Sequence, residues 1–113
     1  MEKVFKFITD ARKAFIQLID ELSIEELNQI PEGFNNNIIW NFGHIVVSTQ
    51  TLCYVRTGIW PDKSAVKFVA AYEKGSKPTY FVDAGEVEML KALSISTIQQ
   101  IEDDYKKRAF ETI

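Results

Sequence analysis

His44 is the residue of this sequence whose type and surroundings best suit metal or acid–base chemistry. It lies in the apolar segment Trp40-Asn41-Phe42-Gly43-His44, which we expect to be helical. Residues three and four apart on a helix are neighbours, so Trp40, Asn41 and Ser48 share one face with the imidazole. Imidazole is the commonest metal ligand and titrates near neutral pH, so this polar face is the candidate site.

Two interpretations of His44 are open at this point. In the structural one, the imidazole is a core group that forms a hydrogen bond with a carbonyl or a hydroxyl. In the functional one, it is a metal ligand or a base, Asn41 orients the ring, and Trp40 and Ser48 belong to the same pocket. Trp40 is most simply a core side chain whose indole N–H needs a partner. No catalytic residue is identified by the pattern itself.

The remaining candidate ligands do not complete a metal site. Cys53 lies nine positions after His44, half a turn out of phase at about 100° per residue, so we expect a small buried hydrophobic side chain there. The carboxylates fall in no recognised ligand spacing, and we expect the acidic run at 102–104 to form a solvated helix face with the basic run at 106–108. These carboxylates are Asp10, Asp20, Glu86, Glu102, Asp103 and Asp104.

Helical periodicity supplies the elements that position these residues. Apolar residues at intervals of three and four predict one long helix over 4–22, a second from the Asn run at 35–37 to about Thr57, and a third from Asp83 to Tyr105. A capping box of Ser23 and Glu26 predicts a short helix that ends before Pro31, and another short helix is expected over 65–72. No segment alternates convincingly with period two, and 79–82 is at most a short extended piece. The sequence therefore predicts an all-α fold, part of an antiparallel bundle.

Composition limits the class of protein. The 113 residues fit a single domain over 1–113, and 13 Lys and Arg against 16 Asp and Glu give a net charge of −3, with no basic stripe for nucleic acid. One Cys excludes an intrachain disulfide. The sequence shows neither a signal peptide nor an apolar run long enough for a membrane span, so we expect a cytoplasmic protein without nucleic-acid or membrane partners.

The sequence resembles the DinB-like (YfiT-like) superfamily. The resemblance rests on NNIIWNFGHI at 36–45 and on the later residues Tyr54, Gly58, Tyr72, Gly75, Ser76 and Pro78. It implies an antiparallel up-and-down four-helix bundle that is a homodimer, in which His44 is the first of three metal-ligating histidines. It further implies a thiol transferase or related enzyme with a divalent metal, zinc or nickel, and a small-molecule or low-molecular-weight thiol substrate.

One feature departs from the family pattern. In the family the other two histidines belong to a fourth helix, whereas His44 is the only histidine of this sequence. Phe110 and Ile113 are apolar residues at the end of the sequence for which no packing partner is predicted. We therefore expect that the chain is C-terminally incomplete, with further ligands beyond Ile113, or that the metal site is lost. The function expected is a metal-dependent transferase or hydrolase. The alternative is a metal-free helical scaffold or a dimerisation or partner-binding module.

Overall fold

The computed structural model describes residues 2–107, and the predicted apolar ends at Phe110 and Ile113 lie outside this range. Within it, the three long helices are α1 (Glu2–Glu21), α3 (Ile38–Gln50) and α5 (Ala84–Lys106), and the two short ones are α2 (Ile24–Asn28) and α4 (Val69–Tyr72). A π-helical turn at Thr51–Val55 extends α3, and a 3-10 turn lies at Lys63–Ala65. The described residues contain no strand, so the all-α prediction is confirmed.

Local capping explains where most of the helices begin. The hydroxyl of Ser23 accepts from the Glu26 N–H, and the Glu26 carboxylate accepts from the Ser23 N–H, both at 3.0 Å. The side-chain oxygen of Asn37 accepts from the Trp40 N–H at 2.8 Å, and that of Asp83 accepts from the Glu86 N–H at 2.8 Å. These side chains satisfy backbone donors that the first turn leaves without partners. The predicted starts at Ser23, within the Asn run at 35–37 and at Asp83 are thus correct, and Asn37 is the residue of the run that caps α3.

The structure differs from the prediction where the backbone leaves α-geometry. The second long helix ends as an α-helix at Gln50 and continues as the π-helical turn, and Gly58 then adopts a φ of 81°, the left-handed value that favours glycine. The short helix expected over 65–72 is divided, because Phe68 has a φ of 65° and separates the 3-10 turn from α4. A non-glycine residue in that region is unusual, so the apolar pattern did not predict this break.

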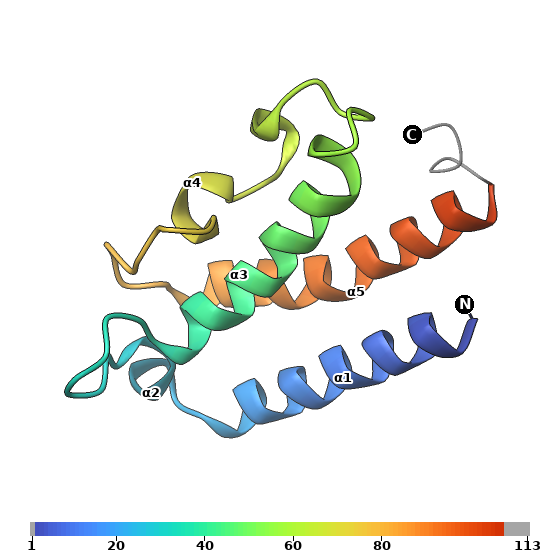
Figure 1. The fold of residues 1–113 in the computed structure, drawn as a ribbon. Coiled ribbons are helices and arrows are strands. Elements are labelled where there is room, and N and C mark those ends of the chain that lie inside the picture. The colour runs from blue at the N-terminus through green and yellow to red at the C-terminus, as the bar shows by residue number, and fades with distance from the viewer. Residues whose placement is uncertain (1, 108–113) are drawn as a thin grey trace.

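The long helices meet around α5, against which both α1 and α3 pack (Figure 1). The main core is formed by residues of all five α-helices, and a second cluster lies where α1 and the π-helical turn after α3 meet the later turns of α5. The α4 segment covers the opposite side of α3 from α1 (Figure 1). The largest buried side chains of the main core include Ile39, Phe42, Val46, Tyr72 and Leu90.

The apolar surface between α1 and α3 is only partly covered. Phe7 on α1 is 74% exposed, and Leu52, in the π-helical turn that follows α3, is 58% exposed. The two helices diverge from the end of the molecule where α2 lies (Figure 1), and an open groove runs between them over α5. Among the described residues, this groove is therefore an apolar surface that the three long helices do not cover.

Two further expectations are tested by the fold. The acidic run at 102–104 is not wholly a solvated face, because Asp104 is half-buried and accepts a hydrogen bond of 2.5 Å from the Tyr54 hydroxyl. The sequence pattern missed this pairing because the two residues lie 50 positions apart. Within residues 2–107, no helix has the length and apolar character needed to cross a membrane.

Candidate functional site

The imidazole of His44 is held by two contacts. Its Nδ1 lies 2.8 Å from the carbonyl oxygen of Tyr72, and its ring stacks on Trp40 with centroids 4.8 Å apart and planes 7° from parallel. A carbonyl oxygen only accepts hydrogen bonds, so Nδ1 carries the proton and donates it. In the neutral form of the imidazole, the lone pair is then on Nε2. The carbonyl bond expected of a core histidine is present, and it also fixes the tautomer that a metal-ligating histidine requires.

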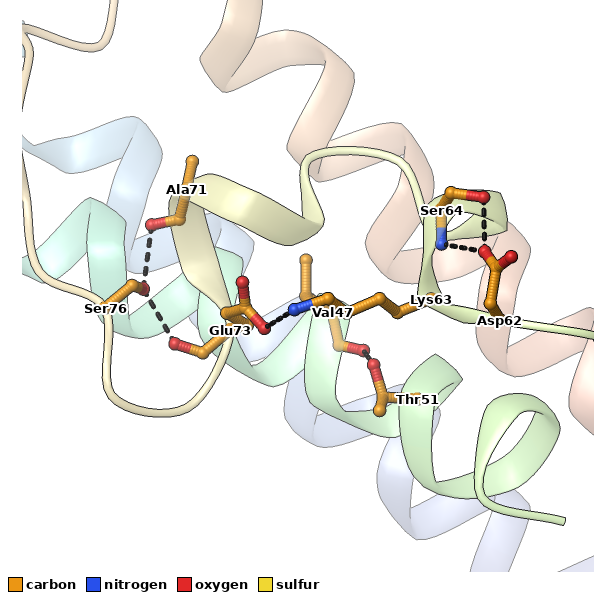
Figure 2. Close-up of polar contacts among 8 residues, drawn as sticks. All are labelled: Val47, Thr51, Asp62, Lys63, Ser64, Ala71, Glu73 and Ser76. Carbon is orange, nitrogen blue, oxygen red and sulfur yellow. Dashed lines mark hydrogen bonds and ion pairs between the residues drawn. The ribbon is translucent and has the colours of Figure 1, made fainter.

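Trp40 is fixed in turn by the segment around α4. The indole Nε1 donates to the Ala71 carbonyl and to the Ser76 hydroxyl, each at 3.2 Å, so the predicted partner of the indole N–H exists. Figure 2 shows the Ser76 oxygen lying close to the carbonyls of Ala71 and Glu73, at 3.1 and 2.7 Å. These bonds hold the loop after α4 against α3. They also fix the Trp40 ring, on which the imidazole stacks.

An ion pair also ties α4 to the segment before it. The ammonium of Lys63 lies 2.9 Å from the Glu73 carboxylate, and beside it the Asp62 carboxylate accepts from the backbone N–H of Ser64 at 2.7 Å (Figure 2). Surface pairs of this kind contribute little energy, but this one joins the 3-10 turn to the end of α4. The turns between them are thus closed into a compact loop that leads into α4.

Gly43 explains why α4 can approach α3 so closely. A Cβ atom at this position would lie 2.5 to 2.7 Å from three atoms of the Tyr72 ring, closer than side chains ever pack. Tyr72 is 2% exposed, so its ring has no free space into which to move. The glycine therefore lets the Tyr72 ring lie on the helix, and the carbonyl of the same residue then reaches His44. This gives the Trp-x-x-Gly-His pattern a physical reason.

Tyr72 also connects the site to α5. Its hydroxyl donates to the Glu86 carboxylate at 2.5 Å, and the hydroxyl of Tyr80 donates to the same oxygen at 2.7 Å. Burial and the hydrogen bond with Glu86 raise the pKa of Tyr72 well above its usual range and that of Tyr80 to about 12. Both phenols are therefore neutral donors at physiological pH. Sequence reasoning counted Glu86 among the carboxylates that fall in no ligand spacing and missed this network.

Asn41 and Ser48 form hydrogen bonds with groups other than the imidazole. The Asn41 amide donates to the Asn37 carbonyl at 2.8 Å and to the Asn36 side chain, so the group that holds the imidazole is the Tyr72 carbonyl. The hydroxyl of Ser48 is half-buried and lies 3.4 Å from the Ile45 carbonyl. Cys53 is half-buried in the groove between α1 and α3, and burial raises the pKa of its thiol.

The arrangement fits one metal ligand. An imidazole with Nδ1–H fixed by a carbonyl is the form in which histidine coordinates metals through Nε2. Within residues 2–107, no three His, Cys, Asp or Glu residues come together in a way that could hold a metal ion. The described residues therefore supply His44 and its support but do not complete a coordination shell.

Comparison with known proteins agrees with the helical fold and the Trp-x-x-Gly-His segment. Neither a curated protein nor a solved structure matches this sequence. A family model does match, and it covers residues 8–112, which is nearly the whole chain. The chain belongs to the DinB superfamily.

Proposed function

We propose that this protein is a metal-dependent enzyme of the thiol transferase or hydrolase type that acts on a small molecule in the cytoplasm. His44 is one ligand, and the remaining ligands come from outside the described residues. The observation that supports this most is the fixed imidazole, because the Tyr72 carbonyl and the Trp40 ring hold it in a ligand's tautomer. Membership of a metal-associated superfamily supports it further. The complete fold in this proposal is an antiparallel four-helix bundle, forming a homodimer.

The residues of the chain have separate tasks in this proposal. The Tyr72 carbonyl holds the Nδ1 proton, so Nε2 remains free to coordinate, and Trp40 prevents rotation of the ring. Gly43 keeps α4 close enough for the Tyr72 carbonyl to reach the imidazole. A bound zinc or nickel ion would lower the pKa of a coordinated water or thiol and so generate a nucleophile at neutral pH.

Metal content tests this proposal. The full-length protein and its His44→Asn and His44→Ala variants would be purified and their zinc and nickel measured. Asparagine can still donate to the Tyr72 carbonyl from the position of Nδ1 but has no group at Nε2. We expect metal in the wild type and its loss in both variants, with His44→Asn the more stable of the two because the hydrogen bond is retained. Equal, near-zero metal in all three proteins would disprove the proposal.

A second candidate function has its own support. The uncovered groove between α1 and α3, with Phe7 and Leu52 exposed on its walls, favours a metal-free scaffold that associates with a partner or with a second copy. Light scattering after size exclusion distinguishes this role. A monomer that stays stable on dilution contradicts it, whereas a dimer that loses its affinity on Leu52→Glu substitution supports it.

A further inference from the structure

Tyr72 ends α4 with a carbonyl group that the helix itself does not use. The helix spans only Val69–Tyr72, and the carbonyls in the last turn of a helix have no partner within it. The Tyr72 carbonyl instead lies 2.8 Å from Nδ1 of His44 and accepts the ring proton. A helix of four residues has too few hydrogen bonds of its own to be stable alone, so contacts with other elements determine where this carbonyl lies.

One of these contacts lies at the far end of the Tyr72 side chain and joins α4 to α5. The hydroxyl donates to Oε2 of Glu86 at 2.5 Å, and a hydrogen bond to a carboxylate is about twice as strong as one between neutral groups. The ring between hydroxyl and backbone is rigid, and it lies against Gly43 with 2% of the residue exposed. The position of the hydroxyl therefore restricts the position of the backbone carbonyl.

Glu86 is itself held in place. It lies in the first turn of α5, where the Asp83 carboxylate accepts from its backbone N–H at 2.8 Å. The hydroxyl of Tyr80 donates to the same Oε2 at 2.7 Å. No ion pair among residues 2–107 includes Glu86, so the two phenols are the groups that share this carboxylate. The carboxylate thus gives Tyr72 a fixed partner on one of the long helices.

The space around the Tyr72 side chain leaves little room for another arrangement. Trp40, Tyr72 and Tyr80 line one hollow of about 10 Å³, which has room for at most one water molecule. Trp40 is also the ring on which the imidazole of His44 stacks. Both contacts of the imidazole, the stacked ring and the carbonyl, therefore belong to one tightly packed group of side chains that includes the partners of Glu86.

We propose that Glu86 is a positioning residue for His44. Through the Tyr72 hydroxyl it fixes the Tyr72 carbonyl, which keeps the ring proton on Nδ1 and leaves Nε2 able to bind a metal ion. This inference rests on the proposed function, because the tautomer matters to metal binding only where Nε2 is a ligand. Without the bond between Tyr72 and Glu86, the carbonyl can move away from the ring. The proton can then occupy either nitrogen, and part of the protein has Nε2 blocked.

Nuclear magnetic resonance on the metal-free, full-length protein tests this proposal. At a pH about two units above the pKa of an unperturbed histidine, the chemical shifts of the two ring nitrogens report the ratio of the two neutral tautomers. Comparison with His44→Asn identifies the signals. Tyr72→Phe, which removes only the hydroxyl, and Glu86→Ala should each shift the ratio toward the Nε2–H tautomer by about tenfold. The double variant should shift it no further, because both changes remove the same hydrogen bond.

Three further variants separate this role from a general effect of charge or packing. Glu88→Gln is the matched control, because it neutralises an exposed carboxylate on α5 that pairs with Lys91, and it should leave the ratio unchanged. Tyr80→Phe keeps the bond between Tyr72 and Glu86 and should shift the ratio less than Tyr72→Phe. Glu86→Gln keeps an acceptor for the Tyr72 hydroxyl and should restore most of the wild-type ratio. Circular dichroism checks that each variant is folded, and if Glu86→Ala is not, Tyr72→Phe decides.

Several results would overturn the proposal. An unchanged ratio in folded Tyr72→Phe, even with a lower urea midpoint, would make the contact with Glu86 purely structural. An equal shift in Glu88→Gln would assign the effect to charge and not to the hydrogen bond.

Zinc affinity is measured separately, and it should fall by about tenfold or less in Tyr72→Phe and Glu86→Ala, since neither side chain touches the imidazole directly. Equal zinc affinity in the wild type and both variants would remove the role in metal binding. If the wild type binds no metal, the proposed enzyme function fails, whereas the tautomer ratio still tests the connection from Glu86 to His44. An unchanged ratio in a protein that does bind zinc would remove this inference and leave the proposed function intact.

Discussion

Gly43 is the residue on which the geometry around His44 depends most. Replacing it with alanine puts a Cβ atom 2.5 Å from the ring of Tyr72, which is buried on all sides. We expect Gly43→Ala to lower the free energy of unfolding by about 1–3 kcal/mol, despite the better helix propensity of alanine, because α4 must move away. Urea denaturation measures the change. The NMR signal of the His44 Nδ1 proton should shift as its distance to the Tyr72 carbonyl grows.

Gly85→Ala is the matched control for this prediction. Gly85 lies in the first turn of α5, where an added Cβ would meet only the Asp83 carboxylate at an ordinary contact distance of 3.4 Å. We expect this substitution to leave stability unchanged or to raise it by up to about 1 kcal/mol. If both substitutions behaved alike, the close approach of Tyr72 would not be the cause.

The candidate site shows what residue types could and could not predict. His44 and Trp40 were found because they lie on one turn of one helix, and helical spacing is local information. Tyr72 was not assigned to the site, since it reaches the imidazole through its backbone carbonyl from 28 positions away. A carbonyl carries no sequence signal, so only the fold could place it. The network of Glu86 was missed for a similar reason, because its phenol partners come from α4 and from the loop between α4 and α5.

At the scale of elements, Asn37 joins two helices. Its side-chain oxygen caps α3 at the Trp40 N–H, its amide donates to the Asn28 carbonyl at 3.0 Å near the end of α2, and the residue is 4% exposed. We expect Asn37→Ala to cost about 1–2 kcal/mol of unfolding free energy. Asn37→Asp should cost less, because the cap is kept and only the donor is lost. Asn35→Ala, at an exposed asparagine two positions earlier, is the control in urea denaturation and should change little.

Helix starts were predictable and helix interruptions were not. Ser23, Asn37 and Asp83 were recognised because a cap is a side chain acting on its own first turn. The division of the short helix at Phe68 depends on a left-handed backbone angle at an apolar residue. Such an angle is unfavourable locally and is held by packing against Tyr72, whose ring centroid lies 6.3 Å from that of Phe68. Tertiary packing overrode the local preference there.

At the scale of the whole molecule, Arg12 joins the three long helices at the floor of the groove. It extends from α1 to Thr49 on α3 and to Ser94 and Thr97 on α5. No pattern in the sequence marks it, since the four residues come together only in the packed structure. The sequence does not distinguish an arginine that will be buried from one that will be exposed, because burial depends on how the helices pack. The apolar seam was predictable from the stripes on the helices, but the charge within it was not.

The stability of an Arg12 variant tests whether the folded protein needs this charge. The hydroxyls of Thr97 and Thr49 already donate to the carbonyls of Leu93 and Ile45, so removing the guanidinium leaves no donor among these groups unsatisfied. Replacing a buried ion pair with apolar side chains of similar volume is often neutral or stabilising by about 1–4 kcal/mol, and Arg12 has no carboxylate partner among residues 2–107 that its removal would leave unpaired. We therefore expect Arg12→Met to unfold at the same urea concentration as the wild type or at a higher one.

Lys13→Met on the exposed side of α1 is the control and should have no effect on the urea midpoint. If Arg12→Met lowers the free energy of unfolding by more than about 1 kcal/mol, the hydrogen bonds of the guanidinium hold the helices together. This structural role would then explain why the arginine is present. A gain would mean that the fold carries a charge that destabilises it. Residues of that kind are typically kept for function, because function and stability compete at the same position. The direction of this one change therefore decides whether Arg12 serves the stability of the described helices.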